Sequence, residues 1–473
     1  MVGFPHNPRW RPDGGARQSR RSPMATSAPS AQQTGVINRR VIEWAAWDWG
    51  SAAFNAVATT FVFMTYLTSD GVFADSGTAN SWVSAGMTVA GLIIALLAPI
   101  TGQRADRRGK GGVWLGWFTG AVVACLFAMY FVHPASVLGP RGALVLGIIL
   151  LGLGNVFFEF ASVNYNAMLN HLGTKENRGR ISGFGWAAGY IGGIVLLLVL
   201  YVCLIGNNLL GVSTEDHLNI RVAMLVAALW FGGFAIPVIL RPPLPKNPRH
   251  DGARESIVDS YKLLWKTVVT LHREAPHSLF FLIASAVFRD GLAGVFTFGA
   301  VLAKSAFGFS AGSVMLFAIA SNVVAGLATA AFGFLDDRIG PKKVIIVSLS
   351  AMVLAGFGVF ALHSRGAIVF WTLGLVLCIF VGPTQSASRS FLSRIIPEGR
   401  EGEVFGLYAT TGRAVSFLAP AMYWVSLAIG GAITPADQDH TYWGILGIML
   451  ILLVGLALTI PVKADRATLD HME

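Results

Sequence analysis

Charged side chains inside long apolar stretches are the residues of this sequence best suited to chemistry. They are Asp48, Glu159, Arg289, Asp290 and Arg413. A charge at the centre of a membrane-spanning helix costs about 2.5–3.5 kcal/mol, so such residues usually serve a function. Burial favours the neutral form of a carboxylic acid, so Asp48 and Asp290 could bind and release protons near neutral pH. The alternative is a static ion pair that only holds helices together, such as Asp290 with Arg413. Glu159 with Arg289 is a second candidate for such a pair.

Polar residues share a helical face with several of these charges. Successive residues of an α-helix are about 100° apart, and at that angle polar stripes form on otherwise apolar stretches. The two long stripes are Asp48, Asn55, Thr59 and Tyr66, and Asn155, Glu159, Ser162 and Asn166. The two short stripes are Asp290, Gly294 and Thr297, and Thr410, Arg413 and Ser416. Such faces are typical of helices that line a polar path through a membrane.

The elements that carry these stripes are expected to be membrane-spanning helices. Of the 473 residues, 54% are hydrophobic and 13% are charged, whereas a soluble domain has about 25% charged residues. The apolar residues form runs of about 20, the length that crosses a bilayer as a helix. The sequence predicts an all-α membrane protein with twelve transmembrane helices, near residues 41–68, 80–103, 112–132, 143–167, 182–205, 221–240, 278–303, 310–334, 344–362, 367–387, 404–428 and 441–462.

A polar interruption divides the predicted helices into two sets of six. It contains Tyr261, Leu264 and Trp265 at helical spacing, which predicts an amphipathic helix on the membrane surface. The first residues of the chain mix arginine with Pro, Ser and Gly, which is typical of disorder. The predicted order is a disordered cytoplasmic tail, a six-helix bundle, a cytoplasmic linker, a second six-helix bundle and a short cytoplasmic tail, at 1–40, 41–240, 241–277, 278–462 and 463–473.

The basic residues predict the orientation of the helices. Of the 35 lysines and arginines, most fall in the tails and loops on the side of the N-terminus. The loops of the other side contain Arg141, Arg221, Lys304 and Arg365. Because basic residues concentrate in cytoplasmic loops, we expect both termini in the cytoplasm and the chain in the cell membrane. This placement also explains the net charge of +10 without a nucleic-acid partner.

Patterns of catalytic and cofactor-binding sites are absent from the sequence or stand in the wrong context. Cys125, Cys203 and Cys378 lie in apolar runs and are too far apart for a metal or redox motif. Residues 308–312 fit the Gly-x-Ser-x-Gly pattern of hydrolases, but they open a predicted membrane helix instead of following a strand. The chain has neither a P-loop lysine motif nor a His-Glu-x-x-His motif. We therefore expect no enzyme activity, no cofactor and no bound metal.

Two short sequences occur in both halves at matching places. Gly102-Gln-Arg-Ala-Asp106-Arg107-Arg-Gly109 follows the second predicted helix, and Gly333-Phe-Leu-Asp-Asp337-Arg338-Ile-Gly340 follows the eighth. Arg178-Gly179-Arg-Ile-Ser-Gly183 precedes the fifth helix, and Glu401-Gly402-Glu-Val-Phe-Gly406 precedes the eleventh. Two matches at nearly the same separation indicate that the two bundles are a pseudo-symmetric duplication.

The first pair of loops has the residues of a breakable cytoplasmic latch. Gly102 and Gly333 allow a neighbouring helix to approach closely. Asp106 and Asp337 can accept hydrogen bonds from the N-terminus of a facing helix or pair with arginine. The remaining predicted latch residues are Arg107, Gly109, Arg338 and Gly340. An ordinary turn with positive-inside charges is the alternative.

The doubled Gly-x-x-x-Asp-Arg-x-Gly loop resembles the signature loop of the major facilitator superfamily. The segments that resemble its vacuole-effluxer-like branch begin at Trp44, Arg180, Asp290, Ser386 and Phe405. The resemblance implies that helices 1, 4, 7 and 10 line a central cavity. The fungal members of this branch export amino acids from the vacuole. Arg104 departs from the pattern, which usually has an apolar residue there.

Together these features predict a secondary active transporter that moves a small polar solute by alternating access. The resemblance suggests amino acids as the solute. The carboxylates of Asp48 and Asp290, one in each half, suggest protons as a second substrate. An exporter of amphipathic drugs and a non-transporting receptor of the same fold are the alternatives. We expect a monomer in the lipid bilayer. Trp44, Trp47 and Trp49 are expected to form an interfacial aromatic belt, with a cation-binding cage as the alternative.

Overall fold

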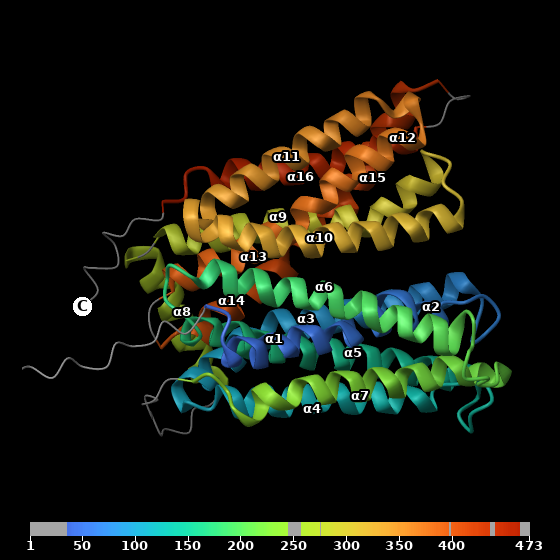
Figure 1. Cartoon of the computed structure of the whole chain (residues 1–473), viewed down its shortest axis with the longest axis horizontal. Coiled ribbons are helices and arrows are strands. Elements are labelled where there is room, and N and C mark those ends of the chain that lie inside the picture. The colour runs from blue at the N-terminus through green and yellow to red at the C-terminus, as the bar shows by residue number, and fades with distance from the viewer. Residues whose placement is uncertain (1–35, 245–256, 275, 397–398, 436–439, 464–473) are drawn as a thin grey trace, which may run out of the picture. The chain divides into compact units, whose positions relative to one another are not determined.

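The computed structural model describes residues 36–244, 257–274, 276–396, 399–435 and 440–463. From Val36 onward the chain forms one compact unit. Every regular element among these residues is a helix, and twelve helical stretches are long and apolar enough to cross a membrane. The predictions of an all-α membrane protein and of its twelve helices are confirmed (Figure 1).

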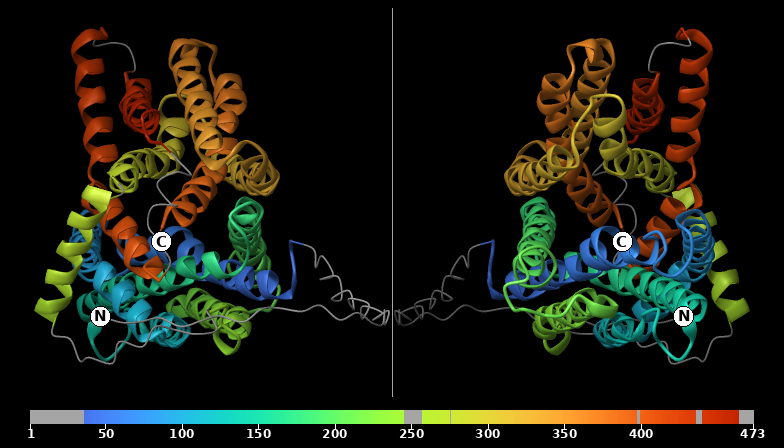
Figure 2. Two further views of the ribbon diagram at one scale, coloured as in Figure 1. Left: turned by 90° about the vertical axis from the view of Figure 1, so that its left-hand side faces the viewer. Right: turned by 90° about the vertical axis from the view of Figure 1, so that its right-hand side faces the viewer.

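The helices form two groups of six. Figure 2 views them nearly end-on and separates a blue-to-green N-terminal group from a yellow-to-red C-terminal group. The N-terminal group contains α1 (Arg39–Ala52) with its continuations η1 (Ala53–Phe61) and α2 (Phe63–Leu67), then α3 (Ser76–Arg108), α4 (Gly111–Ala128), α5 (Gly139–Ala167), α6 (Arg178–Leu200) and α7 (Leu218–Leu240). The C-terminal group contains α9 (Pro276–Ser305), α10 (Ala311–Ile339), α11 (Pro341–Ala361), α12 (Ala367–Val369) continued by η7 (Phe370–Gly374) and α13 (Leu375–Ile395), α14 (Glu401–Ala414) followed by α15 (Leu418–Ile433), and α16 (Gly444–Thr459).

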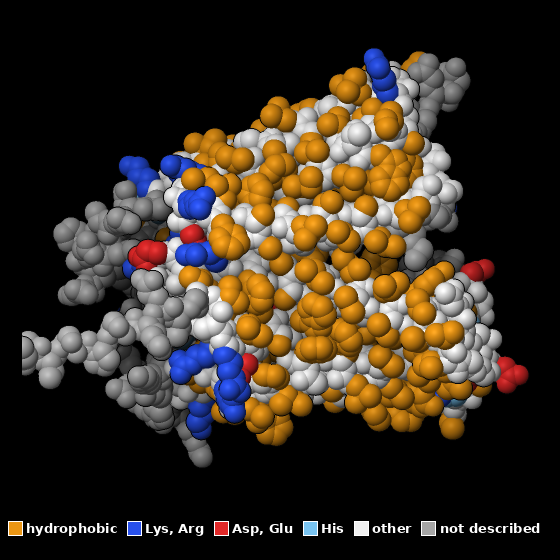
Figure 3. Space-filling model, in the orientation of Figure 1, with side chains coloured by type: hydrophobic (Ala, Val, Ile, Leu, Met, Phe, Trp, Pro, Cys, Tyr) orange, Lys and Arg blue, Asp and Glu red, His pale blue; other side chains and the backbone are white. Residues whose placement is uncertain are grey.

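Charged residues lie mainly at one end of the helices. Lys and Arg gather at the left of Figure 3, while orange apolar side chains cover the flank of both groups. We call the end at which α1, α6 and α11 begin the basic end, and the other the far end. We infer that this broad apolar flank faces lipid, because soluble proteins rarely expose so large an apolar surface to water. The chain is a multi-pass membrane protein.

The N-terminus of the first helix differs from the prediction. The predicted tail extends to residue 40, but α1 begins at Arg39, where the Asn38 side chain accepts a hydrogen bond from the Val41 amide at 3.2 Å. A side-chain acceptor at this place satisfies one of the free amides of a helix start. The rest of the predicted tail, residues 1–35, lies outside the described residues, as do residues 464–473 of the C-terminal tail.

The tenth membrane helix is longer than predicted. The expected end was residue 387, where the sequence turns polar, but α13 continues to Ile395. Ser388, Arg389 and Ser390 are nevertheless almost fully buried. This polar stretch packs against the other helix group. Hydropathy alone therefore placed the end of the tenth helix too early.

The linker between the groups contains the helix α8 (Ile257–Glu274). One face, with Ser260, Leu264 and Leu271, is buried against the bundle, whereas Val258 and Trp265 are exposed. Because its apolar residues lie on both faces, α8 can pack on the protein with one face and contact lipid with the other. The preceding linker residues, 245–256, lie outside the described part of the chain.

Candidate functional site

The two helix groups touch mainly along two crossings. Helix α3 packs against α14, and α6 packs against α10. Both α14 and α6 begin at the basic end, so these crossings join the groups there. Each crossing pairs a helix of one sequence repeat with a helix of the other, as expected for two duplicated halves.

At each crossing an aspartate binds the start of a helix from the opposite group. The Asp337 carboxylate accepts hydrogen bonds from the Gly179 amide at 2.8 Å and from Arg180 Nε at 2.6 Å, at the start of α6. Asp106 Oδ2 accepts a hydrogen bond from the Glu403 amide at 2.9 Å, at the start of α14. Helix N-termini have unpaired amides and a partial positive charge, so both contacts are favourable. The two repeated sequences therefore bind one another crosswise between the groups.

Glycines allow the backbones to meet at these crossings. A Cβ atom on Gly102 would overlap the carbonyl oxygen of Gly402, and one on Gly333 would lie 3.0 Å from the carbonyl oxygen of Gly179. Gly109 ends α3 with a φ of 60°, in the left-handed region that favours glycine. The corresponding Gly340 has a φ of 89°.

The arginines of the two loops differ in exposure. Arg338 is exposed and Arg107 is half-buried. Arg394, which lies beyond the predicted end of the tenth helix at residue 387, pairs with Asp336 at 2.8 Å and with Asp337 at 3.1 Å. Arg104, the departure from the family pattern, donates a hydrogen bond to Ser260 of α8 at 3.1 Å.

Asp48 forms an ion pair across the groups that the sequence did not predict. Arg389 Nη1 lies 3.4 Å from Asp48 Oδ2 and donates to Asn166 Oδ1 at 3.2 Å. Arg389 also donates to the Ser182 hydroxyl at 3.0 Å and to its carbonyl oxygen at 2.7 Å. The Tyr165 hydroxyl donates to Asp48 Oδ2 at 2.8 Å. One buried guanidinium from α13 thus holds three helices of the N-terminal group.

Aromatic rings surround this arginine. The Arg389 guanidinium lies 5.0 Å from the Trp44 ring and 5.6 Å from the Trp186 ring, within the range of cation–π attraction. Trp44 stacks on Tyr165 with ring centroids 4.5 Å apart, and Trp47 stacks on the same ring at 4.4 Å. Because Trp44 and Trp47 are almost fully buried, the predicted interfacial belt is wrong for these two residues. Trp44 instead joins Tyr165 and Trp186 in a cage around a cation, and that cation is the protein's own Arg389.

A second ion pair joins the groups at Glu159. Arg413 Nη2 lies 3.3 Å from Glu159 Oε2 and 3.4 Å from Asn155 Oδ1. Glu159 thus pairs with Arg413, so the suggested pair with Arg289 is wrong. The sequence could not decide between the two arginines, because each lies within a helix of the C-terminal group. Asn55, in the stripe of helix 1, is exposed, and its carbonyl oxygen accepts a hydrogen bond from the Thr59 hydroxyl of the same helix at 2.8 Å.

Asp290 and Arg289 lie beside an interruption of the eleventh membrane helix. This helix ends as α14 at Ala414 and restarts as α15 at Leu418. Asp290 Oδ2 accepts a hydrogen bond from the Ala419 amide at 2.6 Å, and Asp290 is buried. Asp290 therefore binds the N-terminus of α15 and does not pair with Arg413, so the suggested Asp290–Arg413 pair is wrong. Arg289 Nη1 donates to the Tyr408 carbonyl oxygen at 3.0 Å, and its guanidinium lies 3.7 Å from the Tyr408 ring.

Sequence reasoning missed Arg389, Tyr165 and Ser182 as site residues. The predicted tenth helix, 367–387, leaves Arg389 outside the membrane, although Arg389 lies in a segment that resembles the vacuole-effluxer-like branch. Its place two residues after a predicted helix end was the available signal. A helix that continues for two more turns would have put Arg389 inside the bundle, where a charge needs a partner.

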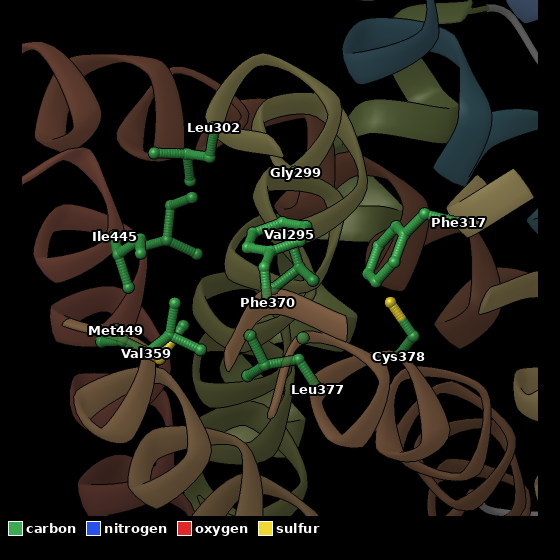
Figure 4. Close-up of a pocket in the computed structure, with 12 residues that line it drawn as sticks. Val295, Gly299, Leu302, Phe317, Val359, Phe370, Leu377, Cys378, Ile445 and Met449 are labelled. Atoms are coloured by element: carbon green, nitrogen blue, oxygen red, sulfur yellow. The ribbon is translucent and has the colours of Figure 1, made fainter. Parts of the chain in front are cut away.

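A small cavity in the C-terminal group is lined mainly by apolar side chains (Figure 4). Its volume is about 30 Å³, and its lining includes Phe317, Phe370, Cys378 and Met449. A polar solute would find no hydrogen-bond partner there, so this cavity is a packing gap and not a solute site.

Comparison with known proteins places this arrangement in a family. A family model described as vacuole effluxer Atg22 like matches residues 71–471. The MFS-type transporter YxiO of Bacillus subtilis, described as uncharacterized, is 24% identical over 417 residues, which cover 87% of this chain and 94% of YxiO. Autophagy-related protein 22-1 of Aspergillus fumigatus is 26% identical over 309 residues, 61% of this chain and 49% of the fungal protein. The chain thus spans about half the length of that fungal relative.

Solved structures share the fold. The major facilitator superfamily transporter FucP in its outward conformation has a TM-score of 0.64 and 15% identity, over 91% of this chain and 100% of FucP. A bacterial homologue of the iron transporter ferroportin in an outward-facing state has a TM-score of 0.63 and 14% identity, over 91% of this chain and 100% of that one. At these identities the likeness concerns the fold alone.

Proposed function

The chain belongs to the Atg22-like vacuole effluxer family of membrane transporters, and from that premise we propose that it moves a small polar, amino-acid-like solute coupled to protons. The proposal rests mainly on two ion pairs, Asp48–Arg389 and Glu159–Arg413. Both join the two helix groups inside the bundle. Ion pairs between two bundles can break and re-form as the bundles rock around a central site. Neither bundle needs to change its internal packing for this motion.

The present arrangement corresponds to a carrier closed at its basic end. The crossings of α3 with α14 and of α6 with α10 bring backbones into contact there. By the positive-inside rule, we assign the basic end and both termini to the cytoplasm. The solute would then reach the polar residues from the far end. We place the carrier in the cell membrane as a monomer.

The solute must be polar, because the residues between the groups are polar and carry both signs of charge. Glu159, Arg289 and Arg413 are only half-buried, and Asn55 is exposed. Partial exposure of such groups within membrane helices is expected of a water-filled cavity. The amino-acid assignment comes from the resemblance to the vacuole effluxers.

Asp48 is the proposed proton carrier. Its carboxylate is shared between the Tyr165 hydroxyl and Arg389. A proton on Asp48 would remove the negative charge that holds Arg389, so protonation favours opening at the basic end. Proton uptake and the movement of the two groups would be coupled in this way.

We expect solute flux in proteoliposomes to depend on an imposed pH gradient, and Asp48→Asn to remove that dependence. The variant keeps the size of the side chain but can neither lose a proton nor attract Arg389. The measurement is the initial rate of radiolabelled amino-acid uptake or counterflow, with and without the gradient. Asp290→Asn serves as the comparison, because Asp290 binds a helix start within its own group.

Gradient-independent flux, with Asp48→Asn and Asp290→Asn both fully active, would contradict proton coupling. Rapid flux of amphipathic drugs with no flux of amino acids would identify an exporter of that class instead. A complete lack of flux over a broad solute panel, from protein that remains folded, would favour the receptor alternative.

A further inference from the structure

Arg289 is a cation inside the bundle that lacks a carboxylate partner among the described residues. Its counterparts Arg389 and Arg413 pair with Asp48 and Glu159. Arg289 contacts the Tyr408 carbonyl oxygen and the Tyr408 ring instead. A charge within a membrane helix is costly unless it is paired or reaches a water-filled cavity. Arg289 is half-buried, so its guanidinium reaches the space between the groups, where it can bind an anion that the described part of the chain does not supply.

The contacts of Arg289 leave most of its hydrogen-bonding capacity unused. A guanidinium has five N–H donors in one plane, and Nη1 uses one of them on Tyr408. The Tyr408 ring and Gly412 hold the group in place, since a Cβ at position 412 would lie 3.3 Å from Nη1. A planar fork that is fixed in this way matches the two oxygens of a carboxylate.

The carboxylates of the same region are all engaged. Asp48 binds Tyr165 and Arg389, Glu159 binds Arg413, and Asp290 binds the Ala419 amide. An ammonium group of a solute would have to displace one of these partners. In the state closed at the basic end, the described charged residues of this region thus include a cation without a carboxylate partner, Arg289, whereas Asp48, Glu159 and Asp290 all have partners.

We propose that Arg289 binds the carboxylate of the transported solute, and that recognition does not require an amino group. This inference rests on the proposed transport function and narrows its solute class to carboxylic acids. It predicts that a deaminated acid binds about as well as the amino acid with the same side chain.

Location supports this assignment. Arg289 lies against the last turns of α14, and Arg413 in the last turn of the same helix reaches Glu159 of the other group. Helix α14 ends here inside the membrane, and interrupted helices near the midplane commonly form the solute site of transporters. A solute bound to Arg289 would therefore lie next to an ion pair that joins the two groups.

The test is a binding experiment on the full chain purified in detergent. Compounds are compared in sets of four that share one side chain: the amino acid, the 2-oxo acid, the amino amide and the amine. Several side chains are included, namely small, branched, aromatic and polar. Binding is read from the shift in melting temperature and from calorimetric titration. We expect both acids of at least one set to bind with Kd values within about threefold of each other, and the amide and the amine to bind at least about tenfold more weakly.

Three variants assign the effect to Arg289. Arg289→Gln should raise the Kd of the acids by about 10- to 100-fold, because a hydrogen-bonded charge is lost. Gly412→Ala keeps the charge but pushes against the guanidinium, and it should raise the Kd as well. Arg365→Gln removes an exposed arginine at the far end and should leave binding unchanged.

Equal binding of acids and amides, an absolute need for the amino group, or no binding by any acid would overturn the proposal. So would unchanged acid binding in folded Arg289→Gln. The outcome for transport is separate. Acid binding that depends on Arg289, without flux in proteoliposomes, would support this inference while contradicting the proposed function. Flux that does not distinguish acids from amides would support the proposed function while contradicting this inference.

Discussion

A single methyl group at position 102 will hold the carrier open at its basic end. In Gly102→Ala the added Cβ would overlap the Gly402 carbonyl oxygen and lie 3.0 Å from a Val163 methyl group. Backbone atoms cannot rotate away as a side chain can, so closure becomes costly. Overpacking typically costs about 1–3 kcal/mol, which lowers the closed population by roughly 5- to 150-fold. Solute flux should fall by a similar factor.

Closure can be measured by the accessibility of a buried residue at this interface. Ser393 is almost fully buried, and its carbonyl oxygen accepts a hydrogen bond from Arg178 of the other group at 2.5 Å. We introduce Ser393→Cys in a chain whose three native cysteines are replaced by serine. In this parent the new thiol should be alkylated slowly. Gly102→Ala should accelerate that alkylation.

Two further substitutions make this result specific. Gly406→Ala, with a Cβ 2.5 Å from Pro99 Cα, should behave like Gly102→Ala. Gly91→Ala is the matched control, because it lies on the same helix α3 and its Cβ would meet nothing within 4 Å. Parent-like alkylation and flux in Gly102→Ala would show that the closed packing is not part of the transport cycle.

Replacing Arg389 with glutamine will nearly abolish transport and open the basic end. The change removes the cation from Asp48 and the hydrogen bonds to Ser182 and Asn166. Loss of one partner of a buried ion pair typically costs about 3–5 kcal/mol, because the other charge remains uncompensated. The closed population should therefore drop by roughly 100-fold or more. Flux in proteoliposomes and alkylation of the cysteine at position 393 measure the two effects.

The double variant Asp48→Asn with Arg389→Gln separates charge from packing. With both charges removed, no uncompensated ion is left, so slow alkylation should return in part while flux remains low. Lys343→Gln removes an exposed cation at the same end and should have no effect. Equal alkylation rates in the single and the double variant would mean that hydrogen bonds, and not the Asp48 charge, hold the groups together.

Local sequence patterns predicted the fold because they depend on residues close together in the chain. Runs of apolar residues predicted the twelve helices, since a bilayer demands about 20 such residues for each crossing. The doubled loop at Asp106 and Asp337 indicated the duplication, since its spacing is visible without any structure. The errors concern places where distant parts of the chain meet, such as the continued helix at Arg389.

By itself the sequence determined the class of this protein, its helices, its two halves and most of the residues that carry charge inside the bundle. Only the tertiary structure decided which partner each charge has. Asp48 could have met any arginine of the other half, and it meets one that the sequence assigned to a loop. Likewise, the repeated sequences were recognisable one by one, but not the fact that the aspartate loop of each group binds a helix start of the other group. The physical reason is that periodicity sets which face of a helix is polar, whereas pairing depends on how two helix groups dock, and docking brings together residues far apart in the chain.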